Sequence, residues 1–198
     1  MKYYEIDFMG NTRDKSLYKS QCILTDVPNY LGRRAFRAGL GIKLGKDWPA
    51  DARMTMDKDF PGTKMGSLIG NPCNYLVCHR DVGAVMQEVC SNEIELLPLT
   101  ILNHRKRPVS DEYVVVNVIG TVDCLDDKAS GIERFEGDVV GMDDPVIDAR
   151  RLPADLDLFR PAAAPSHLIM SLNLGRALAK KKFTNFALDE VKVINRKK

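Results

Sequence analysis

The sequence predicts an α+β fold in which two strand-helix-strand units, at about residues 75–102 and 167–193, share a mixed or antiparallel sheet. Two observations predict this class. Each region places an apolar 3.6-residue period between two short apolar runs, and the second region repeats the first 92 residues later. The chain has 198 residues, of which 44% are hydrophobic and 28% are charged. This composition is typical of globular domains and excludes collagen-like, low-complexity and wholly disordered chains.

The first unit begins with an apolar run at residues 75–78, which is typical of a buried strand. Val82, Val85, Met86 and Val89 then recur at the spacing of one helix face, and Asp81 is placed to cap that helix. Residues 94–102 resume as a strand.

The second unit aligns with the first without a gap, and aligned residues are similar in polarity. Leu76 and Val77 correspond to Leu168 and Ile169, and Gly83 corresponds to Gly175. A real duplication and a shared set of periodicities both account for this agreement, and both predict similar structures for the two units.

The remaining segments complete the predicted organisation. Residues 113–118 are a β-branched run suited to a central strand, and residues 3–8 predict a short strand. Glycines and a proline interrupt later periodicity in residues 1–60, which we expect to form an irregular, partly helical region packed on an α+β domain at 61–198. Its basic residues, which we interpret as a solvated face, are Arg33, Arg34, Arg37, Lys43 and Lys46.

Charge and cysteine content indicate the cellular compartment. The net charge of +2 does not favour direct nucleic-acid or membrane binding, and no apolar run reaches the length of a membrane span, about 20 residues. Five cysteines without a Cys-x-x-Cys pair suit a reducing compartment. We therefore expect a cytoplasmic protein with free thiols.

Two charged segments are candidate binding sites. Residues 123–148 contain nine acids against two bases, with glycines that predict surface loops and an edge hairpin. The candidate partner-binding residues there are Asp126, Asp127, Glu133, Glu136, Asp138, Asp143 and Asp144. A cationic turn before Pro108, formed by His104, Arg105 and Arg107, is a candidate site for a phosphate or carboxylate.

Signatures of catalysis and cofactor binding are missing from the sequence. It contains no phosphate-binding glycine loop, no G-x-S-x-G elbow and no H-E-x-x-H pair. A thiol triad of Cys124, His104 and Asp123 is permitted by spacing but not specified by it. We therefore predict no catalytic residue, no metal site and no cofactor.

Four stretches carry a resemblance to a known family. They read LLPLTILNHRKRPV from Leu96, VVVNVIGTVDCLD ending at Asp126, ARRLPADLDLFR ending at Arg160, and FTNFALDEVKV near the end. Together they resemble the eleventh immunity-protein family of bacterial polymorphic toxin systems, over residues 45–194. The resemblance implies a non-catalytic protein that binds a toxin encoded nearby and protects the producing cell and its kin. The basic amino-terminal region and a glycine-broken insert at 130–144 depart from the family pattern.

Two other functions remain open at this point. A regulator or sensor would bind a small ligand in a cleft between the two units, and an enzyme would use Cys124 or the His104 turn. An apolar pocket with converging polar groups would favour the first, and a perturbed thiol or imidazole near a base would favour the second. The sequence also leaves homodimerisation open.

Overall fold

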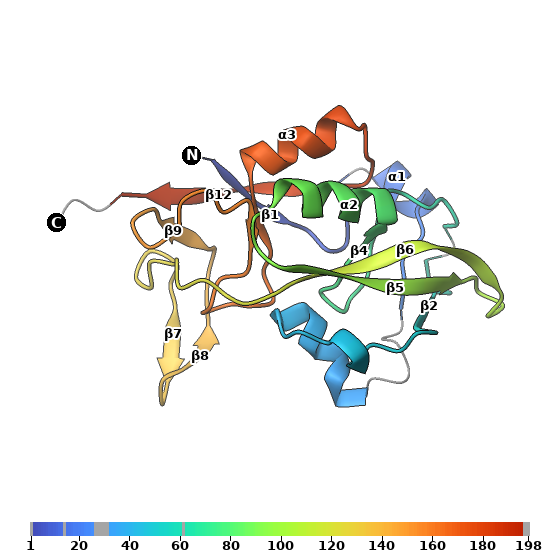
Figure 1. Ribbon diagram of the computed structural model, residues 1–198, viewed down its shortest axis with the longest axis horizontal. Coiled ribbons are helices and arrows are strands. Elements are labelled where there is room, and N and C mark those ends of the chain that lie inside the picture. The colour runs from blue at the N-terminus through green and yellow to red at the C-terminus, as the bar shows by residue number, and fades with distance from the viewer. Residues whose placement is uncertain (1, 14, 26–31, 61, 196–198) are drawn as a thin grey trace.

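The computed structural model describes residues 2–13, 15–25, 32–60 and 62–195, and within them it forms two five-stranded sheets, a separate hairpin and a few helices. Two of the helices, α2 (Arg80–Val89) and α3 (Leu172–Lys180), lie side by side on one side of the molecule (Figure 1). Both ends of the described chain lie at the same end of the molecule. The predicted α+β class is confirmed.

The first sheet has the order β2-β5-β6-β4-β3. Its strands are β2 (Arg53–Thr55), β3 (Leu68–Ile69), β4 (Leu76–His79), β5 (Ile94–Leu102) and β6 (Pro108–Val118), and α2 (Arg80–Val89) connects β4 to β5. Because β6 pairs antiparallel with both β4 and β5, those two strands run parallel. The β-branched run at 113–118 is thus central, as predicted.

The second sheet has the order β10-β11-β1-β12-β9. It consists of β1 (Tyr3–Ile6), β9 (Val146–Asp148), β10 (Leu158–Phe159), β11 (Ile169–Ser171) and β12 (Leu188–Ile194), and α3 (Leu172–Lys180) connects β11 to β12. The amino-terminal strand β1 lies between β11 and β12 and is antiparallel to both.

The two sheets have the same strand order, strand directions and register. In each, the edge strand β2 or β9 runs parallel to its neighbour, and the other pairings are antiparallel. One row of paired residues crosses the first sheet as Leu68, Cys78, Val114 and Pro98, and the equivalent row crosses the second as Leu158, Met170, Tyr4 and Glu190. Along the sequence, the central strand β6 comes after the other strands of the first sheet, whereas the central strand β1 comes before the other strands of the second sheet.

The prediction that the two regions share one sheet is wrong. β4 and β5 belong to one sheet, and β11 and β12 belong to the other. The reason is that each sheet has its own central strand, β6 or β1, which satisfies the backbone groups of both neighbours. The half that contains the first sheet and the half that contains the second sheet pack together instead, mainly in an apolar cluster that includes Leu76, Met86, Leu174 and Leu178.

Both helices lie close to their sheets at a glycine. A Cβ atom at Gly83 would lie 2.8 Å from Leu96 Cδ2, and one at the equivalent Gly175 would lie 3.3 Å from Met170 Cε. The cap of α2 is His79, whose Nδ1 accepts from the Asp81 amide at 3.3 Å, so the prediction of an Asp81 cap is wrong. Its imidazole reaches the amide two residues ahead, as a capping side chain does.

The other elements surround the sheets. They are α1 (Lys15–Ser20), two 3-10 helices η1 (Gly32–Leu40) and η2 (Gly45–Asp47), and a hairpin of β7 (Glu133–Phe135) and β8 (Asp138–Gly141). Within the first 60 residues, β1 and β2 are hydrogen-bonded into the two sheets. The division of the chain near residue 60 stays a prediction.

Candidate functional site

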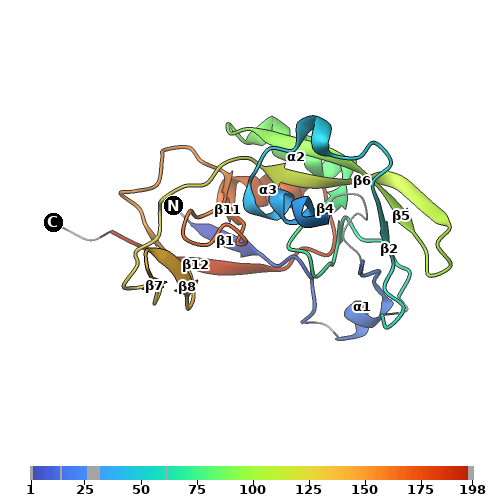
Figure 2. The ribbon, with the colours of Figure 1, turned by 90° about the horizontal axis from the view of Figure 1, so that it is seen from below.

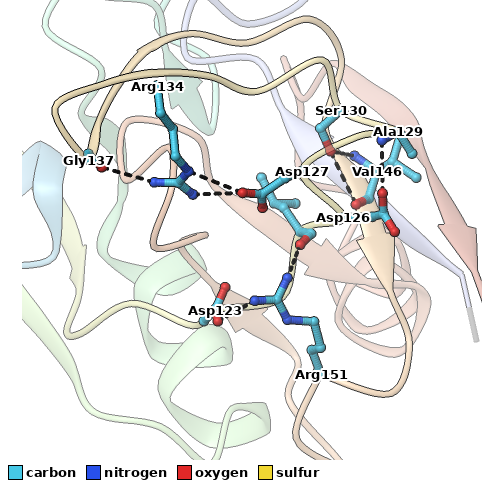
Figure 3. A network of polar contacts seen from close by, with 10 residues as sticks. Asp123, Asp126, Asp127, Ala129, Ser130, Arg134, Gly137, Val146 and Arg151 are labelled. Atoms are coloured by element: carbon cyan, nitrogen blue, oxygen red, sulfur yellow. Dashed lines mark hydrogen bonds and ion pairs between the residues drawn. The ribbon is translucent and has the colours of Figure 1, made fainter.

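The acidic segment begins in a loop that is held to the body by backbone and side-chain hydrogen bonds (Figure 3). Asp126 is buried, and its Oδ1 accepts from the Ala129 amide at 2.8 Å while its own amide donates to the Val146 carbonyl at 2.9 Å. Ser130 Oγ accepts from the Val146 amide at 2.9 Å. Asp126 therefore stabilises the fold, and as a buried residue it differs from the other acids of the segment.

Arginines fix the position of the hairpin that follows. Arg134 donates from Nε and Nη2 to Asp127 Oδ2 at 3.1 and 3.0 Å, and its Nη1 reaches the Gly137 carbonyl at 3.3 Å. Arg151 pairs with Asp123 and donates to the Leu125 carbonyl. These contacts brace the loop and the hairpin before any partner arrives, although exposed pairs of this kind each add little to stability.

The hairpin itself projects from the body (Figure 1). Glu136 and Gly137 have φ values of 51° and 95°, which is the backbone of a tight two-residue turn. The predicted residues Glu133, Glu136, Asp138, Asp143 and Asp144 are all exposed on this segment. Asp127, which pairs with Arg134, is exposed as well, so six of the seven predicted acids lie at the surface.

Sequence reasoning missed two apolar residues on the same hairpin. The side chains of Phe135 and Val140 are 66% and 63% exposed. Strand alternation next to an acidic turn was the available signal, because a two-stranded hairpin without a covering layer leaves its apolar residues in solvent. Large apolar side chains surrounded by charges are typical of protein contact sites.

Two open depressions flank the hairpin. One of 510 Å³ is lined by Ile132, Glu133, Met142 and Asp143 among others. The other, of 620 Å³, lies between Arg134 and Asp138 on one side and Ala162 and Ala163 on the other. Side chains of a protein partner could fit into these depressions.

The predicted anion-binding turn lies elsewhere. Asn103 Oδ1 accepts from the amides of Arg105 and Arg107 at 2.9 and 3.1 Å, which forms the turn between β5 and β6 and leaves His104 and both arginines exposed. Figures 1 and 2 both show the β5-β6 turn at the opposite end of the molecule from β7 and β8. The structure therefore does not bring the two predicted sites together.

The thiol chemistry that an enzyme would need finds no support. Cys124 is buried, and burial raises the pKa of its thiol to about 12, whereas a nucleophilic cysteine needs a lowered pKa. His104 belongs to the distant β5-β6 turn. In the described residues, no group of three or more histidine, cysteine or acidic side chains is placed to hold a metal ion.

The space between the two halves is packed core on the helix side. Residues from both, including Leu76, Val82, Leu168 and Leu174, form one buried cluster. Within the described residues, this side of the junction is therefore packed core, and we develop the exposed hairpin as the candidate site.

A comparison with models of known protein families assigns this chain to a family. The model of the Imm11 immunity protein family matches residues 5–193. The chain belongs to the Imm11 family. The Imm11 match covers both sheets, the hairpin and both helices, and it supports an immunity function with a cognate toxin as partner.

Two further findings complete the comparison. The search of curated proteins finds no match for this Imm11 chain. Among the described residues, no helix combines the length and the apolar character that crossing a membrane requires. Immunity protein families are generally non-enzymatic.

Proposed function

We propose that this Imm11 protein neutralises a cognate toxin domain, encoded near its own gene, by binding the toxin and covering its active surface. It acts in the cytoplasm, without a cofactor and without turnover. The observation that supports this proposal is the β7-β8 hairpin, a braced projection that exposes Phe135 and Val140 among carboxylates.

The apolar residues of the hairpin would supply most of the affinity. A few large side chains usually dominate a protein interface, and aromatic residues are prominent among them. Because Arg134 and the Glu136-Gly137 turn fix the hairpin before binding, little conformational entropy remains to be lost in the complex.

The carboxylates would govern encounter and selectivity. Opposite charges accelerate association and discriminate against wrong partners more than they raise affinity. The toxin surface that receives Glu133, Glu136 and Asp138 is therefore basic. If the toxin acts on nucleic acid, that basic surface is its substrate groove, and the hairpin occupies it as a phosphate mimic.

Co-expression tests the proposal directly. Cells producing the toxin domain encoded beside this gene should grow only when the Imm11 protein is also made, and the two proteins should co-purify. Toxicity that persists in full, or failure to co-purify, contradicts the proposal.

Charge-neutralising variants test the contact residues. The variant with Asp138→Asn, Asp143→Asn and Asp144→Asn should associate with the toxin domain about tenfold more slowly at low ionic strength, and this difference should shrink in high salt. A matched control, with Asp59→Asn, Asp81→Asn and Asp111→Asn, removes three exposed charges outside the segment. Equal association rates for the two triple variants would rule out the acidic segment as the contact surface.

A further inference from the structure

The two halves of the molecule carry insertions at equivalent places. In the first half, Ile23 bridges Gly70 in parallel and Leu24 bridges Met56 antiparallel; the second half repeats both bridge types, with Val122 on Pro161 and Leu125 on Ile147. In each half, the chain then makes an excursion before it enters the edge strand, β2 or β9. The first excursion forms η1 and η2, and the second forms the β7-β8 hairpin.

These insertions differ in structure between the two halves, and they also expose apolar side chains. Within the described residues, the exposed large hydrophobic side chains are Phe36, Leu40, Ile42, Phe60, Val109, Phe135 and Val140. All but Phe60 and Val109 lie in the two insertions. Phe36, the most exposed of those at η1, is 61% exposed. We call Phe36, Leu40 and Ile42 the η1 surface.

The two insertions lie on the same side of the molecule. Figure 1 shows the blue helical turns of η1 and the β7-β8 hairpin below the sheets, opposite α2 and α3, and Figure 2, seen from below, shows both on the near side. This arrangement follows from the repeat, because equivalent connections in two similarly built halves emerge from equivalent positions.

Buried contacts hold η1 in place against the second half. The Gly120 amide donates to the Gly41 carbonyl at 2.9 Å, and the fully buried Arg160 donates from Nη2 to the Ala38 carbonyl at 3.3 Å and from Nη1 to the Pro165 carbonyl at 2.8 Å. The chain that continues from Arg160 supplies Ala162 and Ala163 to the 620 Å³ depression beside the hairpin. Ala162 and Ala163, which line this depression, thus follow closely along the chain after the arginine that binds η1.

The η1 surface is mainly apolar in character, although the sequence around it is basic. Arg37 pairs with Asp47 at 3.4 Å, and Lys43 pairs with Glu93. These pairs offset part of the local positive charge and leave the apolar side chains as its distinctive feature. The interpretation of this stretch as only a solvated face therefore omits the exposed Phe36.

We propose that the η1 surface and the β7-β8 hairpin bind the same toxin domain at once, so that the immunity protein holds its partner at two points. This inference rests on the proposed function. The partner surface has a basic region, which receives the hairpin carboxylates, and an adjoining apolar region, which covers Phe36, Leu40 and Ile42.

Alanine substitution with matched controls tests the inference. Binding of the purified toxin domain, encoded beside this gene, is measured for Phe36→Ala, Phe135→Ala, Phe60→Ala and Val109→Ala. Phe36→Ala and Phe135→Ala should each weaken binding about 10- to 30-fold, in a complex with one molecule of each protein. Phe60→Ala and Val109→Ala, which truncate exposed apolar residues outside the insertions, should change the Kd less than about twofold. Because Phe36 is exposed, its variant should unfold at the same denaturant concentration as the parent.

Hydrogen exchange in the complex gives an independent readout. Amides of residues 36–43 and 134–140 should both gain protection when the toxin domain binds. If Phe36→Ala binds like the parent and only the hairpin is protected, the two-point interface is refuted while the proposed function stands. If Phe36→Ala abolishes self-association of this chain and leaves toxin binding unchanged, the η1 surface binds a second copy and the inference is likewise refuted. If the parent protein does not bind the toxin domain, the proposed function fails and the inference falls with it.

Discussion

Glycine-to-alanine substitution in the two equivalent helices should have opposite effects on stability. Alanine favours a helix over glycine by about 1 kcal/mol. At Gly83 the new Cβ would lie 2.8 Å from Leu96 Cδ2 and 3.3 Å from Val114 Cγ2, so two packed side chains must shift, at a cost of about 1–3 kcal/mol. We expect Gly83→Ala to lower the free energy of unfolding by about 1 kcal/mol.

The equivalent site in α3 provides the comparison. At Gly175, among the described residues outside the local helix backbone, the new Cβ would meet Met170 Cε at 3.3 Å, and this methyl group ends a flexible side chain that can move aside. The gain in helix propensity should dominate there, so Gly175→Ala should raise the free energy of unfolding by about 0.5–1 kcal/mol.

Urea unfolding measures both effects with an internal control. Ala84→Gly, at an exposed position next to Gly83, reports the propensity contribution alone and should destabilise by about 1 kcal/mol. The midpoints should separate the two alanine variants by about 2 kcal/mol at an unchanged m-value, or by about 4–8 °C in thermal unfolding. Equal stabilisation by both variants would refute the close approach of α2 to its sheet.

Three further predictions concern titratable groups. Hydrogen bonds from Arg150 lower the pKa of Asp148 to about 2. The ionised carboxylate therefore stabilises the fold fully above the unfolded pKa, near 4, and this stabilisation is lost as the pH falls through 2. Asp148→Asn should lose less stability than the parent between pH 4 and pH 2. Glu5 raises the pKa of His167, so the protonated imidazole stabilises the fold. This contribution is complete below about pH 6.5 and is lost as the pH rises through the folded pKa. The free energy of unfolding should therefore differ less between pH 5.5 and pH 8.5 for His167→Gln than for the parent. A thiol reagent at pH 8 should label the partly exposed Cys73 first and the four buried cysteines only on unfolding; rapid labelling of native Cys73→Ser would contradict this.

The sequence predicted elements better than it predicted their partners. Apolar spacing located β4, α2 and β5 because it reports which residues face a core. It could not show that β1 pairs with β12, since the Tyr3–Val191 pairing joins opposite ends of the chain and leaves no local signal. For this reason two sheets with separate central strands were predicted as one.

The candidate site shows the same limit at the level of single residues. Composition identified an acidic hairpin region, but it did not distinguish Asp126, which is buried beneath the loop, from Asp138, which faces solvent. The difference depends on which carboxylate accepts a turn amide, and several neighbouring aspartates compete for that role in the sequence. Phe135 was overlooked because an isolated aromatic residue does not show from sequence alone whether another layer covers it.

The central position of β1 also affects how the protein can fold while it is being made. The ribosome releases β1 long before β12, yet each needs the other to complete the second sheet. The first sheet, whose strands span residues 53–118, can pair much earlier in translation. Until translation reaches β12, the newly released β1 has unpaired edges that could bind another polypeptide, so a nascent-chain chaperone that shields β1 should increase the yield of active protein.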